Sequence, residues 1–330
     1  MIRHSLEEIQ FNPNSVVTVG TFDGVHVAHK KILETLVEKA KSHESRSVVI
    51  TFVPHPQEIL QKKKTEMLLN DAERIRRISD AGIDEICLLK FDHDFSVVTA
   101  EDFLVELLYK KIGMHELVLG YNHTFGYKAQ GTVEFAREVG KRIGFKVDFV
   151  EKVLIEGTIV SSSNIRKLLK SGDILLANKM LGRPYSFDGF VVRGNGRGRL
   201  LGYPTANLKA VDESVLIPGF GIYFAEVVLG EEKFTGLASI GVRPTFEDSG
   251  ATTVEVWISD FYRDIYAKRV SISFIHRLRD EMKFDSADQL IAQMDQDKKM
   301  MDEYLAKISP SPKGSFGESG IFDNKKQRSF

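Results

Sequence analysis

The sequence has almost no cysteine, no excess of charge of either sign and no long hydrophobic run. Cys87 is the only cysteine in 330 residues, which excludes an internal disulfide and a multi-cysteine metal site and favours a reducing compartment. Lysine and arginine number 45 against 46 acidic residues, so bulk attraction to nucleic acid or a membrane surface is not expected. No stretch approaches the roughly 18 apolar residues of a membrane span, and MIRHSLEEIQ has no signal-peptide core. We expect a cytoplasmic monomer or weak homo-oligomer whose partners are small molecules.

Short apolar runs alternate with helical stretches from residue 16 to about 160. Runs rich in β-branched residues, such as VVTVG and SVVITFV, are separated by segments such as HKKILETLVEKAKSH. This alternation is typical of a mostly parallel, helix-covered sheet that binds ligands at the carboxyl ends of its strands. Residues 161–182 indicate two helices, with serine capping the first and Gly172-Asp173 between them. We expect an α/β domain over 1–183.

The pattern changes after Pro184 to strands with alternating hydrophobicity, separated by glycine. Segments such as GIYFAEVVLG, FTGLASIG and TTVEVWISDF predict a small antiparallel barrel or sandwich. An amphipathic helix is expected over about 286–307. Its inner face would consist of Leu290, Ile291, Met294, Met301, Tyr304 and Leu305. We therefore expect a second domain over 184–307, and we predict that the Ser/Pro/Gly/Lys-rich tail 308–330 is disordered.

Two histidines, His26 and His29, lie one helical turn apart where VVTVG leads through a loop into a helix. A helix N-terminus offers free amides and partial positive charge, so this junction favours a phosphate to which both imidazoles could donate. Gly20 and Gly24 let the backbone approach a ligand, and Asp23 is a polar group at the strand end. An isolated HxxH is more often a pair of surface or capping histidines, and it lacks the spacing and third ligand of a zinc site.

A second glycine-rich stretch, GNGRGRLLGYPTANL, occupies residues 194–208. Its glycines permit a backbone cradle around phosphates. Thr205 and Asn207 alternate on an extended segment, so both point to one side and offer oxygen ligands suited to Mg²⁺. No Walker A sequence occurs, which excludes a P-loop kinase. Glu255 alternates with Val254 and Val256, and from the pattern alone it would be an exposed strand residue.

GTFDGVHVAH resembles the signature of the HxGH nucleotidyltransferase superfamily, and SSSNIR at 161–166 resembles its downstream serine-rich motif. The resemblance implies a Rossmann-like adenylyltransferase domain with His26 and His29 as catalytic residues. The implied ATP site consists of Gly20, Phe22, Asp23, Gly24, His26, His29, Ser162, Ser163 and Arg166. Asn122, in GYNHTFGYKAQG, resembles a family asparagine beside the flavin or nucleotide, and its alternative is a turn residue.

GRGRLLGYPTANL is similar to the flavokinase signature. The resemblance implies a small β-barrel kinase domain in which Thr205 and Asn207 hold magnesium and Glu255 is the general base for the 5′-hydroxyl of riboflavin. The implied ATP site consists of Gly196, Gly198, Gly202, Pro204, Thr205 and Asn207. Glu255 and Arg279 form the implied flavin site, with a solvated charge cluster as the alternative for Arg279.

Over residues 15 to 307, the chain resembles the prokaryotic bifunctional riboflavin kinase/FMN adenylyltransferase family. This implies that ATP and riboflavin give FMN and ADP in the second domain, and that ATP and FMN give FAD and pyrophosphate in the first. Ala28 stands where that family has glycine, so a kinase-only protein is one alternative. A non-catalytic flavin-binding regulatory module is another, against which Glu255, Thr205 and Asn207 argue, because a binder needs no base.

Overall fold

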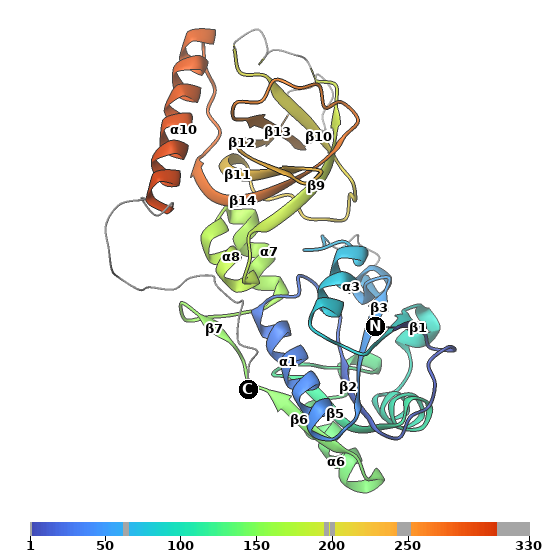
Figure 1. The fold of residues 1–330 in the computed structure, drawn as a ribbon. Helices are drawn as coiled ribbons and strands as arrows, with labels where there is room; N and C mark the ends of the chain where they lie inside the picture. Colours follow the sequence, from blue (N-terminus) through green and yellow to red (C-terminus); the bar gives the residue numbers. More distant parts are fainter. Residues whose placement is uncertain (1, 62–65, 195–197, 199–201, 243–251, 309–330) are drawn as a thin grey trace, which may run out of the picture. The chain divides into compact units, whose positions relative to one another are not determined.

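The computed structural model describes residues 2–61, 66–194, 198, 202–242 and 252–308. The chain divides into two compact units, Met1–Lys283 and Phe284–Phe330. The first contains a six-stranded sheet and a closed six-stranded barrel, and the second contains the helix α10 (Ala287–Ile308) (Figure 1). Apart from Ile308, the tail that we predict to be disordered lies outside the described residues.

The sheet of the N-terminal part has the strand order β1-β4-β3-β2-β5-β6, and all neighbouring strands are parallel. Its strands are β1 (Ile2–Ser5), β2 (Ser15–Val19), β3 (Arg46–Val53), β4 (Glu85–Lys90), β5 (Met114–Gly120) and β6 (Lys146–Val150). The runs VVTVG and SVVITFV are confirmed as strands β2 and β3, and β1 is an edge strand that the pattern did not indicate. The strand order reverses at β2 and β5, which is where a doubly wound sheet binds its ligands.

Helices cover both faces of this sheet because successive side chains of a strand point to opposite faces. Val16 of β2 packs with α1 (Val27–Ser42) and α3 (Asp71–Asp80), whereas Val17 packs with η1 (Phe103–Ile112), a π-helix, and α6 (Val133–Ile143). The connecting segments carry shorter elements: α2 (Pro56–Gln61), α4 (His93–Ser96), α5 (Ala100–Asp102), η2 (Tyr127–Ala129), β7 (Leu154–Ile155) and β8 (Thr158–Ile159). Cys87 is fully buried on β4, as expected of a strand residue.

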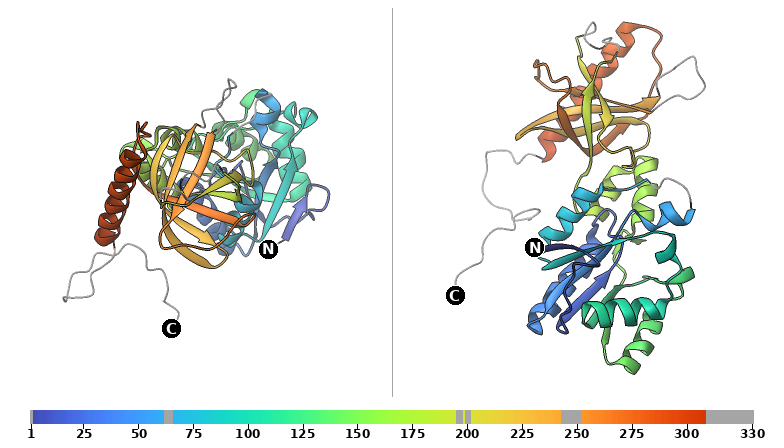
Figure 2. Two further views of the ribbon diagram at one scale, coloured as in Figure 1. Left: turned by 90° about the horizontal axis from the view of Figure 1, so that it is seen from above. Right: turned by 90° about the vertical axis from the view of Figure 1, so that its right-hand side faces the viewer.

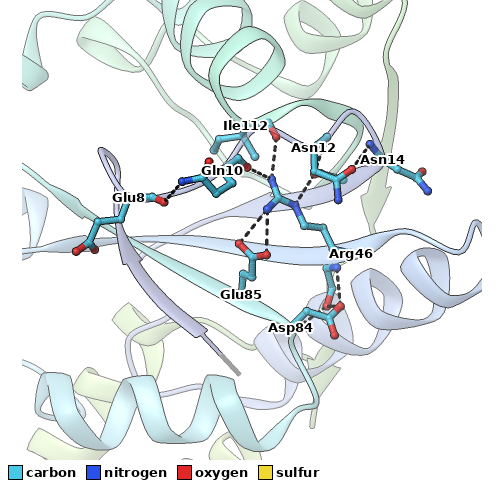
Figure 3. Close-up of polar contacts among 10 residues, drawn as sticks. Glu8, Gln10, Asn12, Asn14, Arg46, Asp84, Glu85 and Ile112 are labelled. Atoms are coloured by element: carbon cyan, nitrogen blue, oxygen red, sulfur yellow. Dashed lines mark hydrogen bonds and ion pairs between the residues drawn. The ribbon is translucent and has the colours of Figure 1, made fainter.

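An arginine ties together the amino ends of the strands, at the opposite end from the loop after β2 (Figure 3). Arg46 Nη1 donates to both carboxylate oxygens of Glu85 at 3.0 Å, and Nη2 donates to the carbonyls of Gln10 at 2.7 Å and Ile112 at 2.9 Å. Nε donates to Ser15 Oγ at 2.8 Å. These bonds hold β2, β3 and β4 to the segment that follows β1.

Two helices follow the sheet, α7 (Ser162–Ser171) and α8 (Ile174–Leu181). Ser161 caps α7 by accepting a hydrogen bond from the Asn164 N–H at 3.2 Å. Gly172, with φ 80°, ends α7 in the left-handed region, and Asp173 caps α8. The predicted break between the two helices is confirmed.

The antiparallel strands close into a barrel in the order β10-β13-β12-β11-β14-β9, which decides between the barrel and the sandwich. The strands are β9 (Tyr185–Val192), β10 (Thr205–Ala210), β11 (Gly221–Leu229), β12 (Glu232–Val242), β13 (Thr252–Ile258) and β14 (Arg269–Arg279). Figure 2 shows them from two further directions, curving around a common interior. Buried residues of the barrel, such as Phe187 and Phe274, form one core with Ile165 and Leu169 of α7 and Leu181 of α8.

The helix α10 confirms the predicted C-terminal helix to within one residue at each end. On its predicted inner face, Met301 is buried and the other five residues are partly buried. Among the described residues, no helix is both long and apolar enough to cross a membrane.

Candidate active sites

The two predicted histidines lie at the reversal of strand order in the sheet. His26 is the N-cap of α1, and its Nδ1 accepts a hydrogen bond from the His29 N–H at 3.3 Å. The two rings stack with centroids 3.5 Å apart, and the Phe22 ring meets His29 edge-on at 5.2 Å. Because His26 Nδ1 accepts, the proton of its neutral ring is on Nε2, which is the donor available to a ligand. The predicted strand-loop-helix context is confirmed.

Burial keeps both imidazoles neutral. It lowers the pKa of His26 to about 3, with a smaller contribution from Arg183. Burial also lowers the pKa of His29 well below its ordinary value, and His26 adds to this effect. At neutral pH the pair therefore offers hydrogen-bond donors rather than positive charge.

Asp23, the polar group at the strand end, is fully buried. Its Oδ1 accepts hydrogen bonds from the backbone N–H groups of Leu68 at 2.9 Å and Leu69 at 3.3 Å. Its Oδ2 lies 2.5 Å from Arg166 Nη2. Burial raises the pKa of Asp23, while Arg166 and the two amides act in the opposite direction. Asp23 thus holds the Leu68-Leu69 backbone and the Arg166 side chain in place from a buried position.

The start of α7 contacts the loop after β2. The motifs GTFDGVHVAH and SSSNIR therefore lie together, as expected if both belong to one ATP site. Ser162 Oγ donates to the backbone carbonyl of Asp23 at 2.9 Å, and Ser163 is exposed. Arg166, besides its pairing with Asp23, donates from Nε to the Glu66 carbonyl at 2.6 Å. The guanidinium group of Arg166, which belongs to the implied ATP site, thus has protein partners here, and its contact with ATP stays a prediction.

Packing accounts for both glycines of the GTFDG loop. A Cβ on Gly24, which has φ +84°, would lie 2.7 Å from Leu68 Cδ1. A Cβ on Gly20 would lie 3.1 Å from the Phe22 ring. Phe22 and Val25 also have positive φ, 51° and 36°, which side chains rarely adopt. The loop is therefore tightly specified by its neighbours, and the contact of either glycine with ATP stays a prediction.

Ala28, the departure from the family pattern, is partly buried and packs against the apolar cluster that includes Leu181 of α8. Its methyl group therefore contacts protein on at least one side. This contact gives the alanine a packing role in the first turn of α1.

Two histidines that the motifs did not indicate also lie beyond the carboxyl ends of strands. His123 follows β5, next to the exposed Asn122, and stacks on Phe125; burial lowers its pKa to about 4. His55 follows β3, and its Nδ1 accepts from the Gln57 N–H at 3.3 Å. Burial, followed by the charge of Arg166, lowers the pKa of His55 to about 4. Because each follows an apolar strand, its position in the sequence could have indicated a residue near the ligand-binding end of the sheet.

Arg74, which is buried, and Arg183, which is partly buried, also support this site. Arg74 of α3 donates to the Thr21 carbonyl at 2.7 Å, the Phe52 carbonyl at 3.1 Å and Asp71 Oδ1 at 2.6 Å, and it also bonds the Thr51 hydroxyl. Arg183 donates to the carbonyls of the loop after β2. Each arginine reaches the site from a different part of the chain, and neither lies within one of the sequence motifs.

The second site lies on the outer face of the barrel, where β10 and β13 pair. Asn207 is directly opposite Glu255, and Thr205 Oγ1 donates to Glu255 Oε2 at 3.0 Å. On β13 the neighbouring Val254 and Val256 are buried and Glu255 is only partly buried, as the alternation predicts. The strand register therefore gathers the three polar residues that we expect to handle phosphate and metal.

Glycines line this group closely. A Cβ on Gly194 would lie 2.3 Å from Asn207 Nδ2, and one on Gly198 would lie 2.4 Å from the Tyr203 carbonyl oxygen. Gly202 has φ +83°, in the left-handed region that favours glycine. Pro204 directly precedes β10, and Gly196 lies outside the described residues. A hydroxyl, an amide and a carboxylate side by side are oxygen donors that suit a hard cation such as Mg²⁺.

Arg279 lies on a strand that pairs with neither β10 nor β13. It ends β14, which is three strands away from β13 in either direction around the closed order. Its Nη1 donates to the Asp280 carbonyl at 2.9 Å. Its predicted contact with flavin stays a prediction.

Two family models match separate parts of the chain. The model described as FAD synthetase matches residues 8–164, and the model described as riboflavin kinase matches residues 181–305. The boundary between the matches falls within α7 and α8. The two candidate sites thus lie in differently matched regions.

Similar proteins match almost the whole chain. A bifunctional riboflavin kinase/FMN adenylyltransferase of Buchnera aphidicola subsp. Acyrthosiphon pisum is 32% identical over 305 residues, which cover 92% of this chain and 96% of the relative. The protein of the same name from Listeria monocytogenes is 33% identical over 300 residues, covering 89% and 94%. A crystal structure described as a macrolide-efflux protein from Streptococcus pneumoniae has a TM-score of 0.83 and 33% identity, covering 92% of this chain and 99% of that one.

Proposed function

Because this chain belongs to the bifunctional riboflavin kinase/FMN adenylyltransferase family, we propose that its two reactions are divided between the barrel and the parallel-sheet part. The barrel phosphorylates riboflavin with ATP to give FMN and ADP. The sheet part then joins FMN to the AMP portion of ATP, giving FAD and pyrophosphate. The observation that carries this division is the match of two family models to different parts of the chain. The first match contains the pair His26 and His29, and the second contains Thr205, Asn207 and Glu255.

In the kinase step, Glu255 is the general base. Its carboxylate accepts the proton of the riboflavin 5′-hydroxyl while that oxygen attacks the γ-phosphorus of ATP and ADP leaves. The hydrogen bond from Thr205 Oγ1 orients one carboxylate oxygen and leaves the other for the substrate. Gly194 and Gly198 let their loop lie close to Asn207 and to the Tyr203 carbonyl, because a Cβ at either position would clash there.

Mg²⁺ fits the donor set on β10. Thr205 can offer a hydroxyl lone pair to the ion while its O–H donates to Glu255, and Asn207 can offer its amide oxygen. When bound, the ion would neutralise charge on the phosphates of ATP. The metal role of Thr205 and Asn207 is part of this proposal.

In the adenylyl-transfer step, a phosphate oxygen of FMN attacks the α-phosphorus of ATP, and the bond to pyrophosphate breaks. The neutral rings of His26 and His29 donate hydrogen bonds to the phosphates, together with the free amides at the start of α1. Asn122 and His123 follow β5, the strand beside β2, and His123 lies close enough to His29 to lower its pKa. No covalent intermediate with the protein is needed, because positioning supplies most of the effect.

The proposal extends to the organisation of the chain. We assign adenylyl transfer to residues 1–183 and kinase activity to 184–307, with 308–330 as a tail outside both. Riboflavin, FMN and ATP are the partners, and the protein acts as a monomer or weak homo-oligomer. The single buried cysteine supports a reducing compartment, the cytoplasm.

The test is a time course of the purified protein with riboflavin, ATP and Mg²⁺, with flavins separated by chromatography. FMN should appear first and FAD should follow. FMN that accumulates without FAD, even when FMN is supplied directly, would support the kinase-only alternative raised by Ala28. An Ala28→Gly variant then distinguishes the cause, because it should restore FAD formation only if the methyl group is the obstacle.

A further inference from the structure

Arg183 lies at the junction between α8 and the barrel, directly before Pro184 and β9. Gly182, with φ 67°, ends α8 in the left-handed region, and the Arg183 N–H donates to the Asn178 carbonyl at 3.2 Å. The backbone of Arg183 therefore belongs to the C-terminal cap of α8. Its side chain reaches the loop between β2 and α1, more than 150 positions earlier in the sequence.

The guanidinium group holds two consecutive carbonyls of that loop. Nη2 donates to the Gly24 carbonyl at 2.7 Å, and Nη1 donates to the Val25 carbonyl at 3.3 Å. Gly24 and Val25 have φ of +84° and +36°. A valine in this region is strained, and such a conformation persists only where the surroundings enforce it. His26 is the next residue, so its place at the N-cap of α1 depends on this loop conformation.

Packing reinforces these hydrogen bonds. A Cβ on Gly182 would lie 2.8 Å from Val27 Cγ1, so the end of α8 touches the first turn of α1 without a gap. Nη1 of Arg183 also donates to the Leu181 carbonyl at 3.3 Å, which fixes the guanidinium to its own helix end. The α8–β9 junction thus contacts the protein on both sides of His26.

The charge of Arg183 acts on the same residue. Burial lowers the pKa of Arg183 to about 10, which still leaves it charged at neutral pH. Arg183 and Arg166 lower the pKa of His26, and His26 and His123 lower that of His29. After burial, the charge of Arg183 is the largest contribution that keeps His26 neutral.

We propose that Arg183 is a positioning residue for adenylyl transfer, which holds the Gly24 and Val25 carbonyls so that His26 and His29 keep their stacked arrangement. This inference rests on the proposed function of the two sites. A planar fork suits the role because it donates to several carbonyls in fixed directions, whereas lysine supplies a single nitrogen. Arg183 falls within the riboflavin kinase match, residues 181–305, but serves the other reaction.

The experiment compares full-length Arg183→Gln and Arg183→Lys with the wild type in two assays, FMN to FAD and riboflavin to FMN. Arg183→Gln should lower the kcat of FAD formation by on the order of 10- to 100-fold, because misplaced catalytic groups cost about that much. Arg183→Lys should recover part of the loss, and riboflavin phosphorylation should stay at the wild-type rate in both. The control is Arg269→Gln, an exposed arginine that pairs with Asp188 at 2.6 Å, which should change neither rate.

The pH profile separates positioning from loss of structure. Removing the positive charge beside His26 raises the pKa of His26, so the acid limb of FAD formation should move to higher pH in Arg183→Gln and stay in place in Arg183→Lys. Equal loss of both activities, or an unchanged kcat and profile in Arg183→Gln, would overturn the assignment. A wild-type protein that forms FMN but no FAD would instead contradict the proposed function of the first site.

Discussion

Glu255 and His29 belong to different sites, so replacing each should remove a different step. Glu255→Gln should lower FMN formation roughly 10²- to 10⁴-fold, the usual contribution of a general base, and leave FAD formation from FMN intact. His29→Ala should lower FAD formation by roughly 10²- to 10³-fold, the effect of losing one donor to the transition state, and spare FMN formation. Both rates are measured for both variants by chromatography of the flavins. FMN formation unchanged in Glu255→Gln would show that another group is the base.

At this scale, sequence patterns predict which face a residue occupies better than which residue it meets. Alternation placed Thr205 and Asn207 on one side of a strand and Glu255 away from its apolar neighbours. That Asn207 stands opposite Glu255 follows from the register of two strands separated by nearly 50 residues, which no local pattern determines. Arg74, Arg183, His55 and His123 escaped prediction because single polar residues outside a motif carry no periodic signal.

At the level of helices and strands, the hydrogen bonds of Arg46 allow a test of stability that does not alter either candidate site. Arg46→Met should lower the free energy of unfolding by roughly 3 kcal/mol. The variant removes the hydrogen bonds from Arg46 to Glu85 and to two backbone carbonyls, where the side chains of Arg46 and Glu85 are only 11% and 16% exposed. Urea unfolding measures this cost. The activity of the folded variant should be unchanged, since the network lies at the amino ends of the strands.

The control for this variant is Lys110→Met. Lys110 pairs with Glu106 at 2.7 Å, but both side chains are 59% exposed, so the change should cost under about 1 kcal/mol. Equal costs for the two variants would mean that the buried network contributes no more than a surface pair.

The ends of helices could be predicted from the sequence where a single residue type determines them. Gly172 and Asp173 predict the end of α7 and the start of α8, because one adopts a positive φ and the other caps a helix. The strand β1 was missed because it is four residues long, polar in sequence and at the sheet edge. Whether the alternating strands form a barrel or a sandwich depends on the pairing of β9 with both β10 and β14, which joins distant segments.

For the whole molecule, the buried neutral histidines predict a loss of stability in acid. The pKa values of His26, His55 and His123 lie at about 3, 4 and 4 in the folded protein, below the ordinary value of 6.5. Below pH 6.5 these histidines bind protons in the unfolded chain but stay neutral in the folded one. Each should therefore lower the free energy of unfolding by on the order of 2 kcal/mol at pH 5. Asp23, whose pKa is raised, acts in the opposite direction at lower pH.

Urea unfolding at pH 7.5, 6 and 5 at constant ionic strength measures this dependence. Stability should change little between pH 7.5 and 6.5 and fall from there toward pH 5. A His123→Phe variant, which keeps the stacking on Phe125, should flatten the decline, whereas replacing the exposed His93 by glutamine should not. A wild-type curve without a decline would show that the histidines are not held neutral.

The core that α7 and α8 share with the barrel limits where the chain can be divided when domains are exchanged between proteins. Ser162 and Arg166 at the start of α7 contact Asp23, while Leu169 near its end accepts a hydrogen bond from the Gly219 N–H at 2.9 Å, in the loop before β11. A kinase module exchanged between proteins at residue 184 would lose part of its own interior. One exchanged at residue 161 would keep that interior and carry with it a wall of the other active site, so the ancestry of the two halves need not divide where their chemistry does.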